Sequence, residues 1–282
     1  MDGFLLINKP VGMTSHDVVF HIKRKLHLDK VGHTGTLDPF ASGLLILVVG
    51  KATKLAHLFS HLDKDYEGTI LFNKHYDTYD VTGKLIDQKE MKLNLNDVKN
   101  KMLSMVGHYH QLPPMYSALK VDGQKLYDLA RKGIEVERET RLVEIKSFLM
   151  TSDIEHDMCD FFASVSKGTY IRTLAVDLGE KLGTYAALKH LNRLRVGTYH
   201  LKDAKSLDDV DSSDLIPLSS FFKYYPSIVL NDYMIKLVRN GVYLDERQIK
   251  TDQDFIVKDL EGHMVAYYEV IKENTYKPVL IF

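Results

Sequence analysis

The sequence predicts an α+β protein: a mixed, largely antiparallel central sheet with flanking helices, and a small β-rich module at the C-terminus. Strand-like and helix-like segments follow one another without the regular alternation of a doubly wound fold. The chain has 282 residues, enough for one large domain and a small one. A polar, acidic stretch at 206–214 precedes Tyr225-Pro226, which indicates a domain boundary near 206–226.

Short apolar runs and turn residues give the expected order of elements. The run 4–7 predicts a buried strand that ends at Lys9-Pro10, and Thr14 or Ser15 is a suitable N-cap for the helix that follows. Strands are expected at 4–7, 44–49, 66–72, 143–150 and 160–166, and helices at 15–27, 51–61, 95–106, 122–132 and 169–182.

Composition excludes several classes of protein. Hydrophobic residues make up 45% and charged residues 27% of the chain, which is typical of a folded globular protein. The aliphatic run 44–49 is far shorter than a membrane span, and residues 1–13 lack the pattern of a signal peptide, so we expect a cytoplasmic protein. The single cysteine, Cys159, forms no disulfide within the chain and no thiolate metal site alone.

Charge is distributed unevenly although the net charge is -1. Residues 1–60 and 161–205 carry a net +3 and +5, whereas 61–160 and 206–282 carry -4 and -5. If the fold brings the two basic segments together, they form a positive face for a polyanion. The alternative interpretation is that the charge merely fluctuates along the chain and that these counts have no functional meaning.

The motifs for common cofactors are absent from the sequence. No phosphate-binding loop, dinucleotide fingerprint, H-E-x-x-H or G-x-S-x-G is present. His57 and His61 lie four residues apart on one expected helix face, but nothing nearby supplies a third metal ligand. We therefore expect no metal and no organic cofactor.

The segment 32–43, GHTGTLDPFASG, predicts a tight loop fixed to the buried strand at 44–49. Such a loop is able to hold the Asp38 carboxylate at a sheet edge. Asp38 in an ordinary Asp-Pro turn is the alternative interpretation.

A second segment, 166–179, predicts a helix with Tyr170 and Arg172 in its first turn. An arginine at the start of a helix is unfavourable to the helix dipole, so a carboxylate partner is expected. Asp38 is one candidate, because pairing would keep a nucleophile or base ionised and oriented. A surface arginine near Asp177 is the other interpretation.

Four stretches, in order along the chain, closely resemble the TruB family of tRNA pseudouridine synthases. They are Ile7 to Ser15, the loop 32–43, Pro113 to Lys120 with the residues that follow to Gly133, and 166–179. The resemblance implies a sheet of the pseudouridine synthase type and isomerisation of uridine to pseudouridine at position 55 in the tRNA T loop. It also implies that the reaction needs no metal or cofactor.

Carried over by position, the resemblance implies roles for seven residues. Asp38 matches the catalytic aspartate, Tyr66 the active-site tyrosine and Arg172 the partner of the aspartate. The substrate-binding positions are His33 and Tyr170, Leu191 as an apolar wall of the uracil pocket, and Lys9 in a supporting role. Ser42, Asn73, Tyr76 and Val165 depart from the family pattern, which affects the pocket rim.

The resemblance also implies a domain plan and a partner. The catalytic domain is expected at 1–225, with an RNA-gripping insertion around 91–140, and a PUA-like RNA-binding module at 226–282. The partner is the T arm of tRNA, and the protein is expected to be a monomer. Phosphate contacts are expected from a subset of Lys9, Lys23, Arg24, Lys25, Lys120, Lys167, Lys181, Arg193 and Arg195.

Two other functions and three chemical routes stay open at the level of sequence. A noncatalytic RNA-binding or tRNA-folding protein would not need Asp38, and a glycosidase would need a second carboxylate about 5–10 Å away. Within the synthase interpretation, ionised Asp38 could attack C1′, add to C6 of uracil, or remove the C2′ proton.

Overall fold

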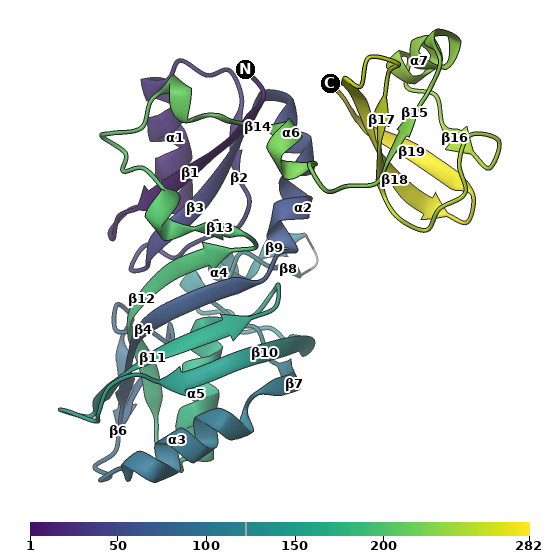
Figure 1. Ribbon diagram of the computed structural model, residues 1–282. Helices are drawn as coiled ribbons and strands as arrows, with labels where there is room; N and C mark the ends of the chain where they lie inside the picture. The colour runs from purple at the N-terminus through teal and green to yellow at the C-terminus, as the bar shows by residue number, and fades with distance from the viewer. Residues whose placement is uncertain (122) are drawn as a thin grey trace.

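The computed structural model describes residues 1–121 and 123–282 and shows a large domain followed by a small β module (Figure 1). A ten-stranded sheet forms the centre of the large domain, and a five-stranded sheet forms the module. Most neighbouring strands of both sheets run antiparallel. The predicted fold class is thus confirmed.

The large sheet joins strands that are distant in sequence. Its order is β14-β1-β3-β12-β4-β11-β10-β7, with β2 paired to β3 and β13 to β12. The pairing of β3 with β12 is parallel and aligns Ser42 with Asn192 and Gly43 with Arg193. The strands are β1 (Gly3–Lys9), β2 (Val31–His33), β3 (Ser42–Val49), β4 (Lys64–Phe72), β7 (Gly107–Gln111), β10 (Arg141–Met150), β11 (Met158–Val165), β12 (Ala186–Val196), β13 (Tyr199–His200) and β14 (Ile216–Pro217).

Strands β1 and β3 are buried on both faces, which explains their nearly continuous apolar sequences. Leu5 and Ile7 of β1 join the core that contains helices α1 (Ser15–Lys25), α3 (Leu95–Ser104) and α5 (Ile171–Lys181). Phe4 and Leu6, on the opposite face, join a second core with Phe59 and residues of the C-terminal module.

The predicted helices are present with shifted ends in several places. Thr14 caps α1 through a capping box with Asp17, in agreement with the sequence-based expectation. The segment 51–61 is a 3₁₀ helix, η1 (Gly50–Leu55), followed by the short helix α2, and position 122 of the expected helix at 122–132 lies outside the described residues. The α-helices are α1 (Ser15–Lys25), α2 (Ala56–Ser60), α3 (Leu95–Ser104), α4 (Leu126–Arg131), α5 (Ile171–Lys181), α6 (Leu218–Phe221) and α7 (Asp232–Arg239).

Strand β12, which lies near the middle of the large sheet, is not evident from the sequence pattern. Its register against β4 shifts twice, between Leu188 and His190 and between Arg193 and Arg195. Bulges disturb the alternation of apolar and polar residues by which strands are recognised. The missed strand carries Leu191 and Arg193 into the region described below.

Two hairpins and two short 3₁₀ helices complete the large domain. Among the described residues, no helix is both long enough and apolar enough to cross a membrane. The remaining elements are β5 (Lys74–Tyr76) with β6 (Leu85–Gln88), β8 (Lys120–Val121) with β9 (Gln124–Lys125), η2 (Leu201–Asp203) and η3 (Ser212–Asp214).

The C-terminal module packs against the large domain through aromatic side chains. Tyr267 lies 4.9 Å from Phe222, measured between ring centroids, and Nε2 of His57 on α2 lies 2.7 Å from Oε1 of Glu269. The five-stranded sheet has the order β15-β17-β18-β19-β16. Its strands are β15 (Ser227–Val229), β16 (Leu244–Asp245), β17 (Phe255–Lys258), β18 (Met264–Lys272) and β19 (Thr275–Ile281).

Candidate active site

The loop between β2 and β3 carries Asp38 and is held by the N-terminal segment of the chain. Ser15 exchanges hydrogen bonds with the Leu37 backbone: its Oγ donates to the carbonyl at 3.0 Å and accepts from the amide at 2.8 Å. The Gly12 amide donates to the Pro39 carbonyl at 2.7 Å. The motif at 7–15 thus fixes the backbone on both sides of Asp38, although the two segments are separate in sequence.

Gly43 lets the end of this loop approach β12. Its φ is +107°, and a Cβ atom there would lie 2.4 Å from the Arg193 carbonyl oxygen. No other residue type fits this position without moving the backbone. The glycine therefore allows β3 and β12 to run side by side below the loop.

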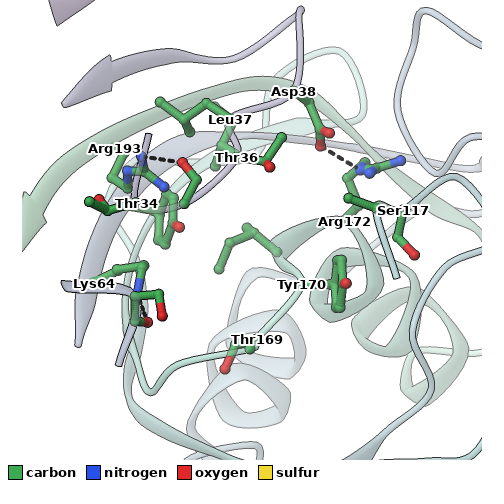
Figure 2. A pocket seen from close by; sticks show the side chains of 17 residues that line it. Thr34, Thr36, Leu37, Asp38, Lys64, Ser117, Thr169, Tyr170, Arg172 and Arg193 are labelled. Atoms are coloured by element: carbon green, nitrogen blue, oxygen red, sulfur yellow. Dashed lines mark hydrogen bonds and ion pairs between the residues drawn. The ribbon is translucent and has the colours of Figure 1, made fainter. Parts of the chain in front are cut away.

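Arg172 pairs with Asp38 and not with Asp177. Its Nε lies 2.9 Å from Oδ2 of Asp38, and the dashed line in Figure 2 marks this contact. The Arg172 side chain is only 6% exposed, whereas that of Asp38 is 34% exposed. The guanidinium is therefore buried behind a carboxylate that keeps an open side. Asp177 instead accepts a hydrogen bond from the Tyr109 hydroxyl at 3.3 Å.

The rest of the Arg172 guanidinium is bound by two separate segments of the chain that precede it. Nη1 donates to the Thr78 carbonyl at 2.8 Å, and Nη2 donates to the Tyr116 carbonyl at 2.7 Å. The buried carboxylate of Asp80 lies 3.7 Å from Nη1. These contacts hold the guanidinium plane in one orientation toward Asp38.

The surroundings of Asp38 favour a basic carboxylate. Burial raises the pKa of Asp38 above its usual value, the nearby Arg172 charge opposes that rise, and Asp80 adds to it. A carboxylate of raised pKa is a stronger base and nucleophile once it is ionised. The ion pair with Arg172 orients it through a charge-assisted hydrogen bond.

A cavity of about 280 Å³ opens beside this ion pair (Figure 2). Tyr66, Tyr170 and Leu191 line it together with Asp38 and Arg172, so five of the seven sequence-predicted site residues meet here. The wall combines aromatic, apolar and hydroxyl groups. Its remaining lining residues are Thr34, Gly35, Thr36, Leu37, Ser60, Lys64, Ser117, Ala118, Gly168, Thr169, Ile171 and Arg193.

Lys9 and His33, the other two predicted site residues, are not among the residues that line the cavity. Lys9 is fully buried, and its ammonium donates to the carbonyls of Pro10 at 2.9 Å and Met13 at 2.6 Å. Burial lowers the pKa of Lys9 to about 8. In this structure Lys9 supports the N-terminal segment from within and has no surface for direct contact with a substrate or a phosphate.

His33 lies on β2, at the start of the loop that carries Asp38. Burial and the Arg193 charge lower its pKa, and its Nδ1 is buried without a hydrogen-bond partner among the described residues. The neutral ring is therefore favoured.

Gln111 is a site residue that sequence reasoning missed. It ends β7 and is 2% exposed, and its amide group clamps the backbone of Tyr170: Oε1 accepts from the amide at 2.7 Å and Nε2 donates to the carbonyl at 3.1 Å. Tyr170 is the N-cap of α5 and has no side-chain cap of its own. No local sequence signal connects these two positions, because only the fold brings β7 to this helix.

Lys64 was also missed, although a signal for it exists. Side chains two residues apart on a strand point to the same face, so Lys64 must face the same way as Tyr66. Both residues line the cavity.

No group of three or more potential metal ligands occurs among residues 1–121 and 123–282. His57 and His61 face each other with ring centroids 6.5 Å apart, and His57 contacts Glu269.

Comparison with known proteins identifies the family. The N-terminal domain of TruB family pseudouridylate synthases matches residues 23–171, and the tRNA pseudouridylate synthase B C-terminal domain matches residues 172–216. The chain is 55% identical to tRNA pseudouridine synthase B of Aster yellows witches'-broom phytoplasma, with both chains covered in full. The chain belongs to the TruB family of pseudouridylate synthases.

A second TruB relative and one solved structure extend the comparison. The tRNA pseudouridine synthase B of Bacillus subtilis is 39% identical over 87% of this chain and 84% of that protein. A chain in the crystal structure of a Cbf5-Nop10-Gar1 complex shares the fold with a TM-score of 0.73 at 23% identity, over 99% of this chain and 84% of that one.

The Asp38–Arg172 ion pair joins the two regions that match the TruB family. Asp38, Tyr66 and Tyr170 lie in the first matched region, and Arg172 is the first residue of the second. Leu191 and Arg193 lie in the second region as well. Both matched regions are therefore needed to form the cavity.

Proposed function

We propose that this TruB family protein isomerises uridine to pseudouridine at position 55 in the T loop of tRNA. The observation that carries the proposal is the Asp38 carboxylate, held by Arg172 at the mouth of a cavity lined by Tyr66 and Tyr170. The relatives named tRNA pseudouridine synthase B, one of them matched over the full length of both chains, support the choice of substrate.

The reaction exchanges one bond for another within a single nucleotide. The bond between C1′ and N1 breaks, the base turns, and C1′ bonds to C5. The proton on C5 is then lost and N1 gains one, so the atoms balance without a redox step. Asp38 acts on the nucleotide as nucleophile or base. Tyr66 supplies an aromatic surface for the base and a hydroxyl for the late proton transfer.

Access to C1′ requires that the target base leave the folded T arm. Base flipping costs on the order of a few kcal/mol, which stacking and polar contacts in the pocket offset. Tyr66, Tyr170 and Leu191 provide the aromatic and apolar wall for the flipped base. Phosphate contacts outside the cavity come from the exposed members of the basic set, and the C-terminal module adds a limited RNA contact.

The glycosidase alternative lacks its second acid. Among the described residues that line the cavity, Asp38 is the only carboxylate. Asp80 is 3% exposed and faces Arg172, so it has no open path to a substrate. A noncatalytic role in tRNA folding is compatible with the same surface and is separated from catalysis by the test below.

The test is pseudouridine formation on unmodified tRNA, mapped to single-nucleotide resolution, for the wild-type protein and for Asp38→Asn. We expect one modified position, uridine 55, and none with the variant. Modification at another position would overturn the T-loop assignment. Normal tRNA binding without modification by the wild-type protein would favour the noncatalytic role.

A further inference from the structure

Two positive side chains, Lys64 of β4 and Arg193 of β12, line the cavity away from the catalytic pair. Figure 2 shows them on the side of the cavity opposite to Asp38 and Arg172. Neither of the two has an ion-pair partner among the described residues. Each is oriented only by neutral backbone carbonyls. Nζ of Lys64 donates to the carbonyls of Ser60 at 3.0 Å and Leu62 at 2.6 Å. Nε of Arg193 donates to the Leu44 carbonyl at 2.7 Å, and its Nη2 donates to the Gly35 carbonyl at 3.2 Å.

The two cations converge on Gly35 in the loop that carries Asp38. A Cβ atom at Gly35 would lie 3.7 Å from Nη1 of Arg193 and 3.9 Å from Cε of Lys64. Nη1 makes no hydrogen bond to any described residue, and Arg193 as a whole is 2% exposed. A donor with a full positive charge is therefore available beside the cavity, where water screens it poorly.

The electrostatic surroundings show an excess of positive charge at this wall. Burial and the Arg193 charge lower the pKa of Lys64 to about 8, and Arg193 also lowers the pKa of Lys9 and of His33. The Asp63 charge raises the pKa of Lys64, but the Asp63 carboxylate is paired with Lys146. Holding unpaired cations in a poorly solvated place costs free energy, which a bound anion would offset.

We propose that Lys64 and Arg193 form a subsite for one backbone phosphate of the flipped nucleotide. The proposal rests on the proposed function, because phosphates are the groups of an RNA substrate that carry a full charge before the glycosidic bond breaks. With the ribose at Asp38, an anionic phosphate attached to it is repelled by the carboxylate and is favoured toward the positive wall on the opposite side of the cavity. A cationic wall there holds the nucleotide by its backbone and leaves Tyr66 and Leu191 free to contact the base, which must turn during the reaction.

The test uses T-arm RNA stem-loops in which one phosphate flanking the target uridine is replaced by a neutral methylphosphonate. Lys64→Met is compared with Lys64→Arg, which keeps the charge, and with Lys202→Met on η2, which removes an exposed lysine outside the cavity and outside the segment 91–140. The RNA substitution does not affect protein folding, and it identifies which of the two phosphates is bound.

On the unsubstituted RNA we expect Lys64→Met to raise KM about tenfold and to leave turnover at saturation within about threefold of the wild-type value. The slope of log affinity against log salt should become shallower by about 0.7–1, because one phosphate contact is lost. One of the two methylphosphonate RNAs should cause a similar rise in KM with the wild-type protein. Combining that RNA with Lys64→Met should add little, because both changes remove the same contact. Lys64→Arg should restore most of the affinity, and Lys202→Met should show no coupling with either methylphosphonate.

Two results would overturn the subsite. One is full additivity of Lys64→Met with both methylphosphonates. The other is a loss of turnover at saturation with unchanged affinity and salt slope, which would mean that Lys64 acts on the charge of the detached base. Failure of the wild-type protein to form pseudouridine on the unsubstituted RNA would instead refute the proposed function.

Discussion

Nε of Arg172 lies 2.9 Å from Oδ2 of Asp38, while the other two guanidinium nitrogens are bound by the carbonyls of Thr78 and Tyr116. All three nitrogens thus have partners from three separate segments of the chain. Because each partner fixes a different edge of the same plane, the arginine cannot rotate without losing several contacts. The position of the carboxylate follows from a rigid support and not from the loop alone.

Asp38→Asn should abolish pseudouridine formation, lowering the single-turnover rate on the order of 10³-fold or more. Asparagine keeps the size of the side chain and accepts a hydrogen bond from Arg172, but it is neither an anionic nucleophile nor a base. Binding of tRNA should change little. A pure Asp38→Asn preparation with substantial turnover would falsify the role of this residue.

Arg172→Lys should lower turnover about 10²-fold, because a misplaced carboxylate loses its productive geometry. A lysine ammonium cannot reach Asp38 and both carbonyls in one plane. The free energy of unfolding should also fall by about 1–3 kcal/mol, since a partly buried carbonyl is left without a donor. Chemical denaturation and single-turnover kinetics of one preparation measure both effects. Kinetics close to wild type would show that the ion pair is unimportant.

Tyr66→Phe should separate the ring from the hydroxyl. The Tyr66 side chain is 6% exposed, and its hydroxyl makes no hydrogen bond to any described residue. Its removal should therefore change stability by less than about 1 kcal/mol. The ring remains for stacking, so affinity should hold while the rate falls about 10²-fold or more. An unchanged single-turnover rate with weaker binding would reverse this assignment.

Local sequence signals made Asp38 and Arg172 candidates for a site, and the resemblance to the TruB family implied their pairing and their roles. Asp38 stands in a loop of glycine, proline and small hydroxyl residues next to a buried strand, and Arg172 occupies an unfavourable place in a first helical turn. Each signal depends on a few neighbouring residues. The local signals alone left Asp38 and Asp177 as alternative partners, and the structure pairs Arg172 with Asp38 as the resemblance implies.

The missed residues depend on pairing between distant strands. Gln111 reaches Tyr170 only because β7 lies at the edge of the sheet next to β10. Arg193 was named from the sequence as a candidate phosphate contact, but its place in the cavity was missed because the bulges of β12 hide the strand pattern. The burial of Lys9 could not be predicted from its lysine side chain, which is normally exposed. Local propensity carries no information on these long-range contacts.

Affinity for tRNA should fall as the pH rises above about 8. The pKa of Lys64 in the free protein is about 8, lowered by burial and by Arg193 and partly restored by Asp63, whereas a bound phosphate would raise it. KM should therefore increase as the free protein loses this proton. Lys64→Arg should flatten the profile above pH 8. A profile that stays the same in Lys64→Arg would assign the titration to Lys9, whose pKa is also about 8.

The lowered pKa of Lys64 also affects how the stability of the protein depends on pH. The folded pKa of Lys64 lies below the unfolded value of 10.5, so the folded protein binds fewer protons between pH 8 and 10.5. The cost of burying the charge is fully present below pH 8 and is relieved as the pH rises toward 10.5. Over this range the midpoint of urea unfolding should fall less steeply with pH for the wild-type protein than for Lys64→Met.

A chain that ends at Pro226 should keep its chemistry and bind tRNA less well. Every residue that lines the cavity precedes residue 194, while β15 to β19 all follow residue 226. The cut also removes Tyr267 from Phe222, which lowers stability by about 1.5–3 kcal/mol for that side chain alone. Assays should therefore run below the lowered Tm, with circular dichroism as the control for folding. We expect KM to rise and turnover at saturation to stay within about threefold of the full chain. A folded truncation that binds tRNA normally and yet forms no pseudouridine would place an essential positioning group in the C-terminal module, because all the chemistry described above lies outside it.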